Sequence, residues 1–438
     1  MSDLHELCYF KSRPITRDVY LTPLKEYLKA GIPATYTTEE AYNYENDIEE
    51  EPSSTTTPMH LICEYVPKDL TEEEEDVVLL MMETLWLNGA GWCLTNDKNE
   101  TPGCVLLRRG LHGSKFWESC VDSGVRAEVL LRKLNDPNVE FLEEEEVGYN
   151  EVESEEIPEL VEERSERRSG AWERGQSQQF SEETEEPIEK KQKVNINEVE
   201  EMYNGPAGAT DTYLKTKLEY KDGALVTKDG SDGVMMQWEE ELMKAGCESL
   251  FKSIEDPQEV NVLNIGFGMG IIDTMIQARN PTKHYISEAH PDVLKKLRQD
   301  GWYEKENVII LEGKWQETLP KLLTEGVFFD GIYYDTFSEH YEDMVEDLFD
   351  VVVGLLKPTG TFSFFNGLGA DRLVCYEVYK KVVDLDLSNY GLSVTFKEMD
   401  APVTTLEQSD DSEDSVWKDI KRAYWRCPVY YHPEVTFM

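Results

Sequence analysis

The chain has 438 residues, which suggests two or three domains, and 40% of them are hydrophobic, enough to build sizeable cores. Its 89 acidic and 43 basic side chains give a formal net charge of -46. This charge argues against a nucleic-acid partner or an anionic membrane, because both carry charge of the same sign, and it favours a basic partner.

The N-terminal part of the chain is predicted to be helical. A short amphipathic helix is expected over residues 20–30, and a longer helical run over residues 77–87 ends at a glycine-rich stop, NGAG. Two further apolar helices open at the Thr-Pro steps of Thr57 and Thr101, which are 44 positions apart. We interpret the run TEEEED at residues 71–76 as an acidic insertion within this repeating pattern.

The segment TPMHLIC, which begins at Thr57, resembles the T-P-L-H-x-A start of an ankyrin repeat. The resemblance covers roughly residues 20–135 and implies a small all-α repeat domain over residues 1–142. Stacked repeats present a concave face, so we expect this domain to dock a protein rather than to carry chemistry. In such repeats a histidine at the position of His60 forms hydrogen bonds between neighbouring turns, so we do not expect a metal ligand there.

A strongly acidic stretch over residues 143–200 follows the predicted repeats. It has many charges, few aliphatic side chains and no sustained period. Such a segment does not bury enough apolar surface to offset the entropy of ordering it, so we predict a disordered or partly helical linker. An acidic bait for basic substrates is the alternative role.

Residues 201–438 are predicted to form one α/β domain. Short aliphatic strands alternate with helical stretches, and this order predicts right-handed crossovers and a mostly parallel sheet. An entry helix is expected over residues 234–243, VMMQWEEELM, at the ligand-binding end. The predicted strands cover residues 260–265, 284–287, 308–311, 331–334 and 361–365, and the helices between them cover residues 272–278, 291–299, 318–323 and 341–356. Two closing strands over residues 392–397 and 423–431 flank an acidic loop over residues 409–414.

The strongest signal in this domain is the stretch VNVLNIGFGMGII at residues 260–272. An aliphatic run, three glycines (Gly266, Gly268 and Gly270) and a second aliphatic run predict a buried strand that feeds a helix through a nucleotide-binding turn. The spacing fits neither the GxGxxG turn of a dinucleotide-binding domain nor a P-loop. S-adenosylmethionine, which has a ribose and no phosphate, is the favoured ligand, and another nucleotide or a structural turn stays open.

Ligands of open α/β sheets bind outside the carboxyl ends of the parallel strands. The residues predicted there are Glu288 after the second strand, EGKWQ at residues 312–316 after the third, and Asp335 after the fourth. An acidic residue about 20 positions after a glycine turn holds ribose hydroxyls, which favours that role for Glu288. Asp335 ends an apolar strand at this mouth and would face a substrate, with a helix N-cap as the alternative role.

Five motifs in this domain, VMMQWEEELM, VLNIGFGMGI, ISEAH, LEGKWQE and FFDGIYYDTF, resemble those of guanidinoacetate methyltransferase in order and separation. Such a domain behind ankyrin-like repeats is similar to the fungal and plant arginine N-methyltransferases that modify the internal (δ) nitrogen of a protein arginine. The resemblance implies an α/β, Rossmann-like methyltransferase domain that uses S-adenosylmethionine. One departure is Phe337-Ser338-Glu339, where the small-molecule enzyme has Tyr-Pro-Leu, and it argues against a small substrate.

The resemblance also implies roles for individual residues. Asp335 and Glu239 would be catalytic and would hold the substrate guanidinium from two sides. Glu288 would bind both ribose hydroxyls, while Trp315 and Gln316 would flank the adenine. The other implied cofactor-binding residues are Tyr213, Met235, Met243, Gly266, Phe267, Gly268, Met269, Gly270, Ile271, Ile272, Ala289 and His290, and Asp335 would lie between cofactor and substrate.

The eight cysteines form no CxxC pair and no metal-ligand spacing, so we expect reduced thiols and no metal site. The N-terminus lacks the apolar core of a signal peptide, and no run reaches the roughly 18 apolar residues of a membrane span. We therefore expect a cytoplasmic and nuclear protein. The resemblance implies that it methylates the δ nitrogen of an arginine in a basic, ribosomal-type protein. A small-molecule guanidino methyltransferase and a non-catalytic ankyrin adaptor are the alternatives.

Overall fold

The computed structural model describes residues 3–49, 55–135, 205–228, 232–254, 256, 258–401, 415–421 and 423–438. The described residues of Met1–Leu130 and of Val194–Met438 form one compact unit. The predicted acidic linker over residues 143–200 and the acidic loop over residues 409–414 lie outside the described residues.

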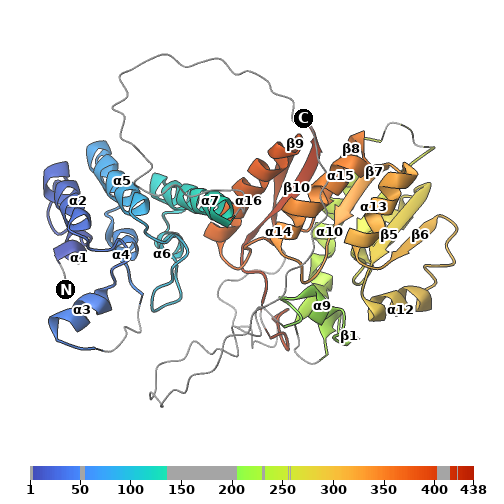
Figure 1. Ribbon diagram of the computed structural model, residues 1–438, viewed down its shortest axis with the longest axis horizontal. Coiled ribbons are helices and arrows are strands. Elements are labelled where there is room, and N and C mark those ends of the chain that lie inside the picture. The colour runs from blue at the N-terminus through green and yellow to red at the C-terminus, as the bar shows by residue number, and fades with distance from the viewer. Residues whose placement is uncertain are drawn as a thin grey trace, which may run out of the picture. The chain divides into compact units, whose positions relative to one another are not determined.

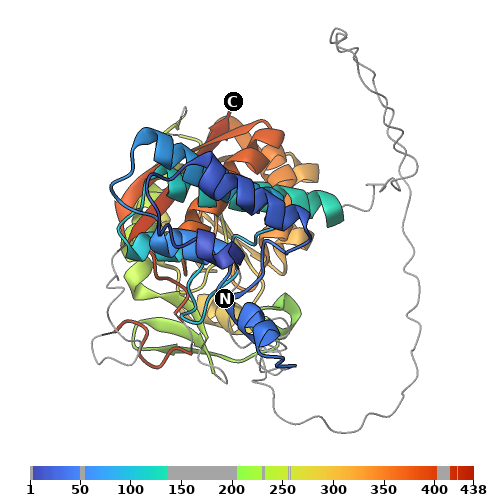
Figure 2. The same cartoon turned by 90° about the vertical axis from the view of Figure 1, so that its left-hand side faces the viewer.

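The N-terminal part is helical, as predicted, and is drawn in blue to teal in Figure 1. Its later helices form two successive pairs, and each pair begins at a Thr-Pro step. These helices face the viewer in Figure 2. The elements are α1 (Asp3–Leu7), η1 (Arg17–Leu21), α2 (Thr22–Lys29), α3 (Thr38–Glu45), α4 (Pro58–Tyr65), α5 (Glu72–Leu87), α6 (Pro102–Arg108) and α7 (Lys115–Asn135).

The acidic run at residues 71–76 forms the N-cap and the first turn of helix α5. Thr71 is the N-cap: its side chain accepts the backbone N–H of Glu74, and the Glu74 side chain accepts the N–H of Thr71. Four glutamates fill the first turn, where the positive end of the helix dipole stabilises negative charge. The charge of this run therefore stabilises the start of a helix, and its interpretation as an insertion stays a prediction.

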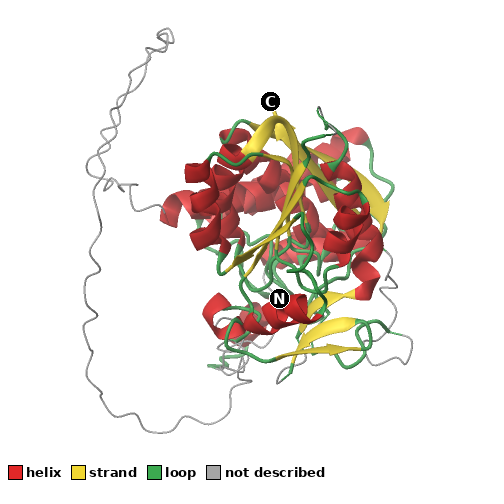
Figure 3. Ribbon diagram, turned by 90° about the vertical axis from the view of Figure 1, so that its right-hand side faces the viewer, coloured by secondary structure: helices red, strands yellow, loops and turns green. Residues whose placement is uncertain are grey.

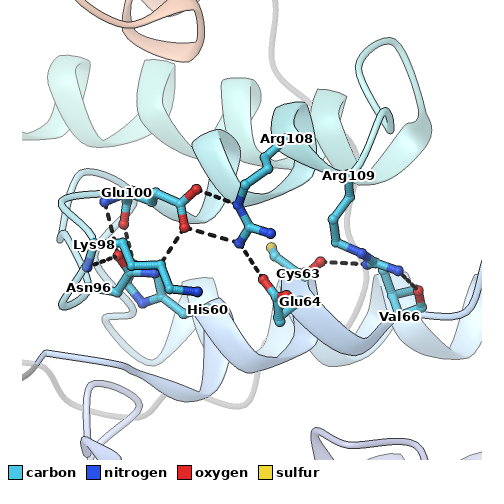
Figure 4. A network of polar contacts seen from close by, with 9 residues as sticks. All are labelled: His60, Cys63, Glu64, Val66, Asn96, Lys98, Glu100, Arg108 and Arg109. Atoms are coloured by element: carbon cyan, nitrogen blue, oxygen red, sulfur yellow. Dashed lines mark hydrogen bonds and ion pairs between the residues drawn. The ribbon is translucent and has the colours of Figure 1, made fainter. Parts of the chain in front are cut away.

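His60 joins the two helix pairs, as Figure 4 shows. Its Nδ1 lies 2.9 Å from the hydroxyl of Thr57, and its Nε2 lies 3.1 Å from the carbonyl oxygen of Leu94 and 3.0 Å from that of Glu100. Burial lowers the pKa of His60, which favours a neutral ring. Arg108, in the second pair, reaches back to Glu64 in the first at 2.6 Å. His60 therefore has a structural role between neighbouring turns.

The C-terminal part contains a seven-stranded sheet in the order β6-β5-β4-β7-β8-β10-β9. The first five strands in this order are parallel, and β10 pairs antiparallel with both β8 and β9. This is the mostly parallel, Rossmann-like sheet that the sequence predicts. The strands are β4 (Asn261–Ile265), β5 (Lys283–Glu288), β6 (Val308–Glu312), β7 (Phe329–Tyr334), β8 (Leu356–Phe364), β9 (Leu392–Asp400) and β10 (Val429–Phe437).

Helices cover both faces of this sheet, as Figure 3 shows with strands in yellow and helices in red. Neighbouring strand residues therefore point into different cores: Val262 packs with α10, α11 and α12, whereas Leu263 packs with α13 and α15. Burial on both faces explains why the strands are almost continuously apolar. The helices are α10 (Glu240–Leu250), α11 (Ile271–Ala278), α12 (Pro291–Gln299), α13 (Trp315–Glu325), α14 (Tyr341–Asp343), η3 (Met344–Leu348), α15 (Phe349–Leu355) and α16 (Leu373–Asn389).

A small antiparallel sheet precedes the seven-stranded sheet in the chain, and the sequence analysis missed it. It consists of β1 (Leu218–Lys221), β2 (Ala224–Thr227) and β3 (Gly233–Met236), and a short helix, α9 (Thr210–Tyr213), comes before it. The entry helix predicted over residues 234–243 is therefore only half right. Its first residues pair with β2, a 3₁₀ turn, η2 (Gln237–Glu239), follows, and α10 begins only at Glu240.

The last strand was also misplaced, because β10 covers Val429–Phe437 and not residues 423–431. Val429 is the first residue that pairs with β9, opposite Asp400, so pairing and not local composition sets the start of the strand. The described residues of 415–428 are irregular and bury Trp417, Trp425 and Cys427. This aromatic segment packs beside the candidate active site.

Helix α16 belongs to two cores at once. Val383 and Leu387 pack toward the sheet, whereas Val374 and Val378 belong to the core that contains the N-terminal helices. Figure 1 draws α7 and α16 side by side, and Lys381 of α16 contacts Asp122 of α7 at 2.7 Å. The N-terminal helices and the sheet domain are thus joined through a continuous apolar core.

Candidate active site

A cavity lies at the carboxyl ends of the central strands. It is lined by residues after β4, β5, β6 and β7, with further walls from α9 and β3. The predicted cofactor residues that line it are Tyr213, Met235, Gly266, Gly268, Glu288, Ala289, Trp315 and Asp335.

Gly266 brings the ends of three strands together. Its N–H donates to the carbonyl oxygen of Ser287 at 2.8 Å, and the N–H of Asp335 donates to that of Ile265 at 2.9 Å. Gly266 has a φ of +93°, and a Cβ at this position would lie 2.0 Å from the carbonyl oxygen of Asp335. Only glycine allows this approach, so the turn places Asp335, which follows β7, directly at the cavity.

Glu288 lies at the end of β5, with a side chain that is 8% exposed. One carboxylate oxygen accepts the N–H of Phe267 at 3.0 Å, and the other accepts the N–H of His290 at 2.6 Å. Burial raises the pKa of Glu288, and these N–H donors oppose that rise. Glu288 lines the cavity, and an acidic residue at the end of the second strand of such a sheet accepts hydrogen bonds from ribose hydroxyls. This fits the ribose of S-adenosylmethionine.

Trp315 begins α13, lines the cavity and is 4% exposed. Its indole N–H points to the carboxylate of Glu339, with distances of 2.8 and 2.9 Å to the two oxygens. Gln316 donates to the same carboxylate at 2.9 Å but does not line the cavity. The structure therefore places Trp315 as an aromatic wall and Gln316 as a neighbour that supports it.

The other predicted cofactor residues lie behind the cavity wall. Phe267 packs edge-on against Trp302, with ring centroids 5.2 Å apart, and its ring fills the space next to Gly270. The Nε2 atom of His290 lies 3.1 Å from the carbonyl oxygen of Tyr213, beside the cavity. Met243, Met269, Ile271 and Ile272 pack in or against the core on the α11 side of the sheet.

A second cavity adjoins the first and shares five lining residues with it: Val234, Asp335, Thr336, Phe337 and Glu339. Both predicted catalytic residues, Glu239 and Asp335, line this second cavity. Glu239 is 3% exposed and accepts the N–H of Met236 at 3.2 Å and the hydroxyl of Tyr424. The two carboxylates therefore meet in one place, although they are almost 100 positions apart in the chain.

Both carboxyl groups are costly to ionise when no cation is bound. Burial, and then the charge of Asp273, raises the pKa of Asp335 to about 7. Burial, and then repulsion from Asp335, raises the pKa of Glu239 well above its ordinary value. Asp335 Oδ2 is buried and has no hydrogen-bond partner among the described residues. The cavity is thus built to receive a cation that brings its own N–H donors.

Two residues of the site escaped the sequence analysis. Tyr424, which holds Glu239, comes from the irregular C-terminal segment, and no motif in the chain pointed to it. Glu339 lies in the loop after β7 and lines both cavities. Its only sequence signal was the departure from Tyr-Pro-Leu at residues 337–339, which was used to judge substrate size and not to assign a role.

Comparisons with known proteins agree with this geometry. Residues 210–386 match the model of the guanidinoacetate N-methyltransferase family. The chain is 57% identical to protein arginine N-methyltransferase 2 of Debaryomyces hansenii over 446 residues, which cover all of both chains. It is 45% identical to the protein of the same name in Saccharomyces cerevisiae over 457 residues, again with full coverage of both. The chain belongs to the protein arginine N-methyltransferase 2 family.

In this family member, no described helix is long and apolar enough to cross a membrane. Across the described ranges, no three His, Cys, Asp or Glu side chains gather in a way that could hold a metal ion. Among solved structures, spermidine synthase of Thermotoga maritima is 14% identical with a TM-score of 0.35, and the match covers 50% of this chain and 72% of that one.

Proposed function

We propose that the protein transfers a methyl group from S-adenosylmethionine to the internal (δ) guanidino nitrogen of an arginine in a protein substrate. The observation that carries the proposal is the position of Asp335. Asp335 lines both the first cavity and the adjoining second cavity, and its Oδ2 is buried without a partner among the described residues. A group at the junction of the two cavities would contact a cofactor in the first and a substrate in the second.

The chemistry of the substrate explains the need for two carboxylates. An arginine side chain is protonated at neutral pH and its lone pairs are delocalised, so it is a poor nucleophile. When S-adenosylmethionine is bound, it supplies a methyl group on a positively charged sulfur. Glu239 and Asp335 accept hydrogen bonds from the terminal nitrogens and concentrate the positive charge on them. The internal nitrogen then keeps more of its lone pair and is held toward the cofactor cavity.

The same arrangement favours reaction at the internal nitrogen over a terminal one. Both outer nitrogens are occupied by carboxylates, which leaves the inner nitrogen as the one that faces the methyl group. As the new carbon–nitrogen bond forms, this nitrogen must lose its proton. Asp335, with a pKa near 7 and an unpartnered Oδ2, is the group that would accept it.

The partner proposed for this site is a basic protein, with ribosomal proteins as the substrate class. The net charge of -46 favours a cationic partner over nucleic acid or an anionic membrane. The helix pairs at the N-terminus would form an ankyrin-like docking surface, because their Thr-Pro caps and bridging His60 follow the pattern of such repeats. We propose the cytoplasm and nucleus as the location.

Two other functions are compatible with parts of the sequence. A small-molecule guanidino methyltransferase is supported by the family model, but the loop Phe337-Ser338-Glu339 and the N-terminal helices favour a protein substrate. A non-catalytic adaptor would have no need for Glu239 and Asp335 in one cavity.

Mass spectrometry of the acid-hydrolysed product tests the proposal. We expect δ-N-methylarginine, and ω-methylarginine alone would exclude the proposed site of transfer. Asp335→Asn should lower kcat by about 10²–10⁴-fold, because it removes the proton acceptor and one hold on the guanidinium. Binding of S-adenosylmethionine, measured by calorimetry, should largely survive in this variant, since Glu288 and the glycine turn are unchanged. A variant with wild-type kcat would exclude the carboxylate mechanism.

A further inference from the structure

Glu339 accepts hydrogen bonds from four neighbouring residues. Besides Trp315 and Gln316, the hydroxyl of Tyr334 donates to it at 2.6 Å and the hydroxyl of Thr336 donates at 2.7 Å. These donors occupy both carboxylate oxygens. The side chain is therefore fixed at the boundary of the two cavities, and it lines both of them.

The backbone around Glu339 is fixed as well. Ser338 has a φ of +65°, which is unusual for a residue other than glycine. The hydroxyl of Thr210 donates to the carbonyl oxygen of Ser338 at 2.7 Å, and His340 Nε2 lies 3.1 Å from the carbonyl oxygen of Gly208. The loop is thus tied to the segment before β1, and this holds Glu339 in place.

None of the donors to Glu339 is a cation, so the negative charge is not cancelled by its partners. Among the described residues, no lysine, arginine or histidine forms an ion pair with it. The second cavity, where the substrate is proposed to bind, is lined by the carboxylates of Glu239, Asp335 and Glu339 and by no lysine or arginine. Its one basic side chain, His340, is directed to the carbonyl oxygen of Gly208.

We propose that Glu339 is a specificity-determining residue: its carboxylate disfavours substrates that carry a free carboxylate near the guanidino group. An arginine within a protein has its carboxyl group in a peptide bond and brings only positive charge. A free guanidino acid would bring a second negative charge into a cavity that offers no lysine or arginine to meet it. Specificity of this kind arises from repulsion of the wrong substrate rather than from added contacts with the right one.

This inference rests on the proposed function, and a matched pair of substrates tests it. The substrates are a short peptide that ends in arginine, prepared as the free acid and as the C-terminal amide. With the full-length protein, kcat/KM for the amide should exceed that for the acid by at least about five-fold, which is the effect of a like charge about 4 Å away even with the screening of bulk water. Glu339→Gln should reduce this ratio several-fold, and a loss of cofactor affinity would affect both substrates equally.

Glu325→Gln is the matched control. Glu325 ends α13, is exposed and lines neither cavity, so its loss removes the same charge and should leave the ratio unchanged. In the wild-type protein, raising the salt concentration should lower the ratio, because salt screens repulsion at the mouth of the cavity. This second measurement does not depend on whether a Glu339 variant folds.

The outcomes separate this inference from the proposed function. If the amide is methylated and the amide-to-acid ratio is the same in Glu339→Gln and wild type, the specificity role is wrong and the proposed function stands. If the protein turns over free guanidinoacetate and neither peptide, both are wrong. If the amide-to-acid ratio falls as much in Glu325→Gln as in Glu339→Gln, the overall charge of the protein explains the effect. That result would also overturn the role of Glu339.

Discussion

At the scale of single residues, the site depends on carboxyl groups that the fold buries. Asp335 and Glu239 line one cavity, and burial raises the pKa of each. The cost of ionising these two carboxyl groups falls when a cation enters the cavity, because an opposite charge favours the ionised form. The two carboxyl groups are therefore in position for a guanidinium before it binds.

The pH dependence of the reaction follows from Asp335. A proton acceptor must be ionised, so kcat/KM should rise through about pH 7 and level off above it. The bound guanidinium favours the ionised form, so the corresponding rise in kcat should lie at lower pH. Steady-state rates measured from pH 5 to 9 check both limbs. A kcat/KM limb below pH 5 would show that Asp335 is not the group that titrates.

The same pKa affects stability with the opposite sign from an ordinary salt-bridged aspartate. The folded pKa of about 7 lies above the unfolded value of about 3.9. The contribution of this group to stability is therefore full below the unfolded pKa and is lost as the pH rises through 7. Asp335→Asn should remove that pH dependence from the free protein.

At the scale of the elements, much of the sheet domain was predictable from the sequence. Its five parallel strands are short apolar runs that recur after each helix, and Glu288 and Asp335 follow such runs. What could not be predicted depends on pairing between distant segments. Residues 234–236 were predicted as the start of a helix, whereas hydrogen bonds to β2 make them part of strand β3. Tyr424 was missed for the same reason.

The glycine turn is the element most sensitive to a single methyl group. In Gly266→Ala, the new Cβ would collide with the Asp335 backbone, and the φ of +93° is unfavourable for alanine. We expect a loss of at least about 1–3 kcal/mol in the free energy of unfolding and at least a ten-fold loss of affinity for S-adenosylmethionine. Urea denaturation and calorimetry measure the two effects.

Gly326→Ala is the control for this prediction. Gly326, just after α13, also has a positive φ of +70°, but nothing lies within 4 Å of a Cβ built there. It should lose about 1 kcal/mol of stability and keep its cofactor affinity. Equal loss of cofactor affinity in both variants would show that backbone strain, and not the contact with Asp335, explains the effect.

At the scale of the whole molecule, the N-terminal helices and the catalytic domain depend on each other. The indole N–H of Trp117 in α7 donates to Glu377 in α16 at 2.7 Å, and His112 lies 3.0 Å from the same carboxylate. Apolar residues of α16 complete the core of the helices. The helices are therefore part of the body that carries the active site, in addition to any docking role.

This shared core predicts one cooperative unfolding transition. Glu377→Ala leaves the buried indole N–H of Trp117 without an acceptor and should cost about 1–3 kcal/mol. The exposed Glu325→Ala should change stability by less than about 0.5 kcal/mol. Far-ultraviolet circular dichroism and tryptophan fluorescence should give the same midpoint in urea. A fragment of residues 201–438 that is as stable as the full chain would contradict the prediction.

The contact between Trp117 and Glu377 spans 260 positions of the chain, and this separation has a consequence for biosynthesis. The N-terminal helices leave the ribosome long before α16 exists, so their apolar face stays uncovered while the rest is translated. At about 5–20 residues per second, that interval lasts roughly ten seconds or more. During this time the nascent chain exposes a surface that chaperones recognise, and its first third reaches its final packing only when translation is nearly complete.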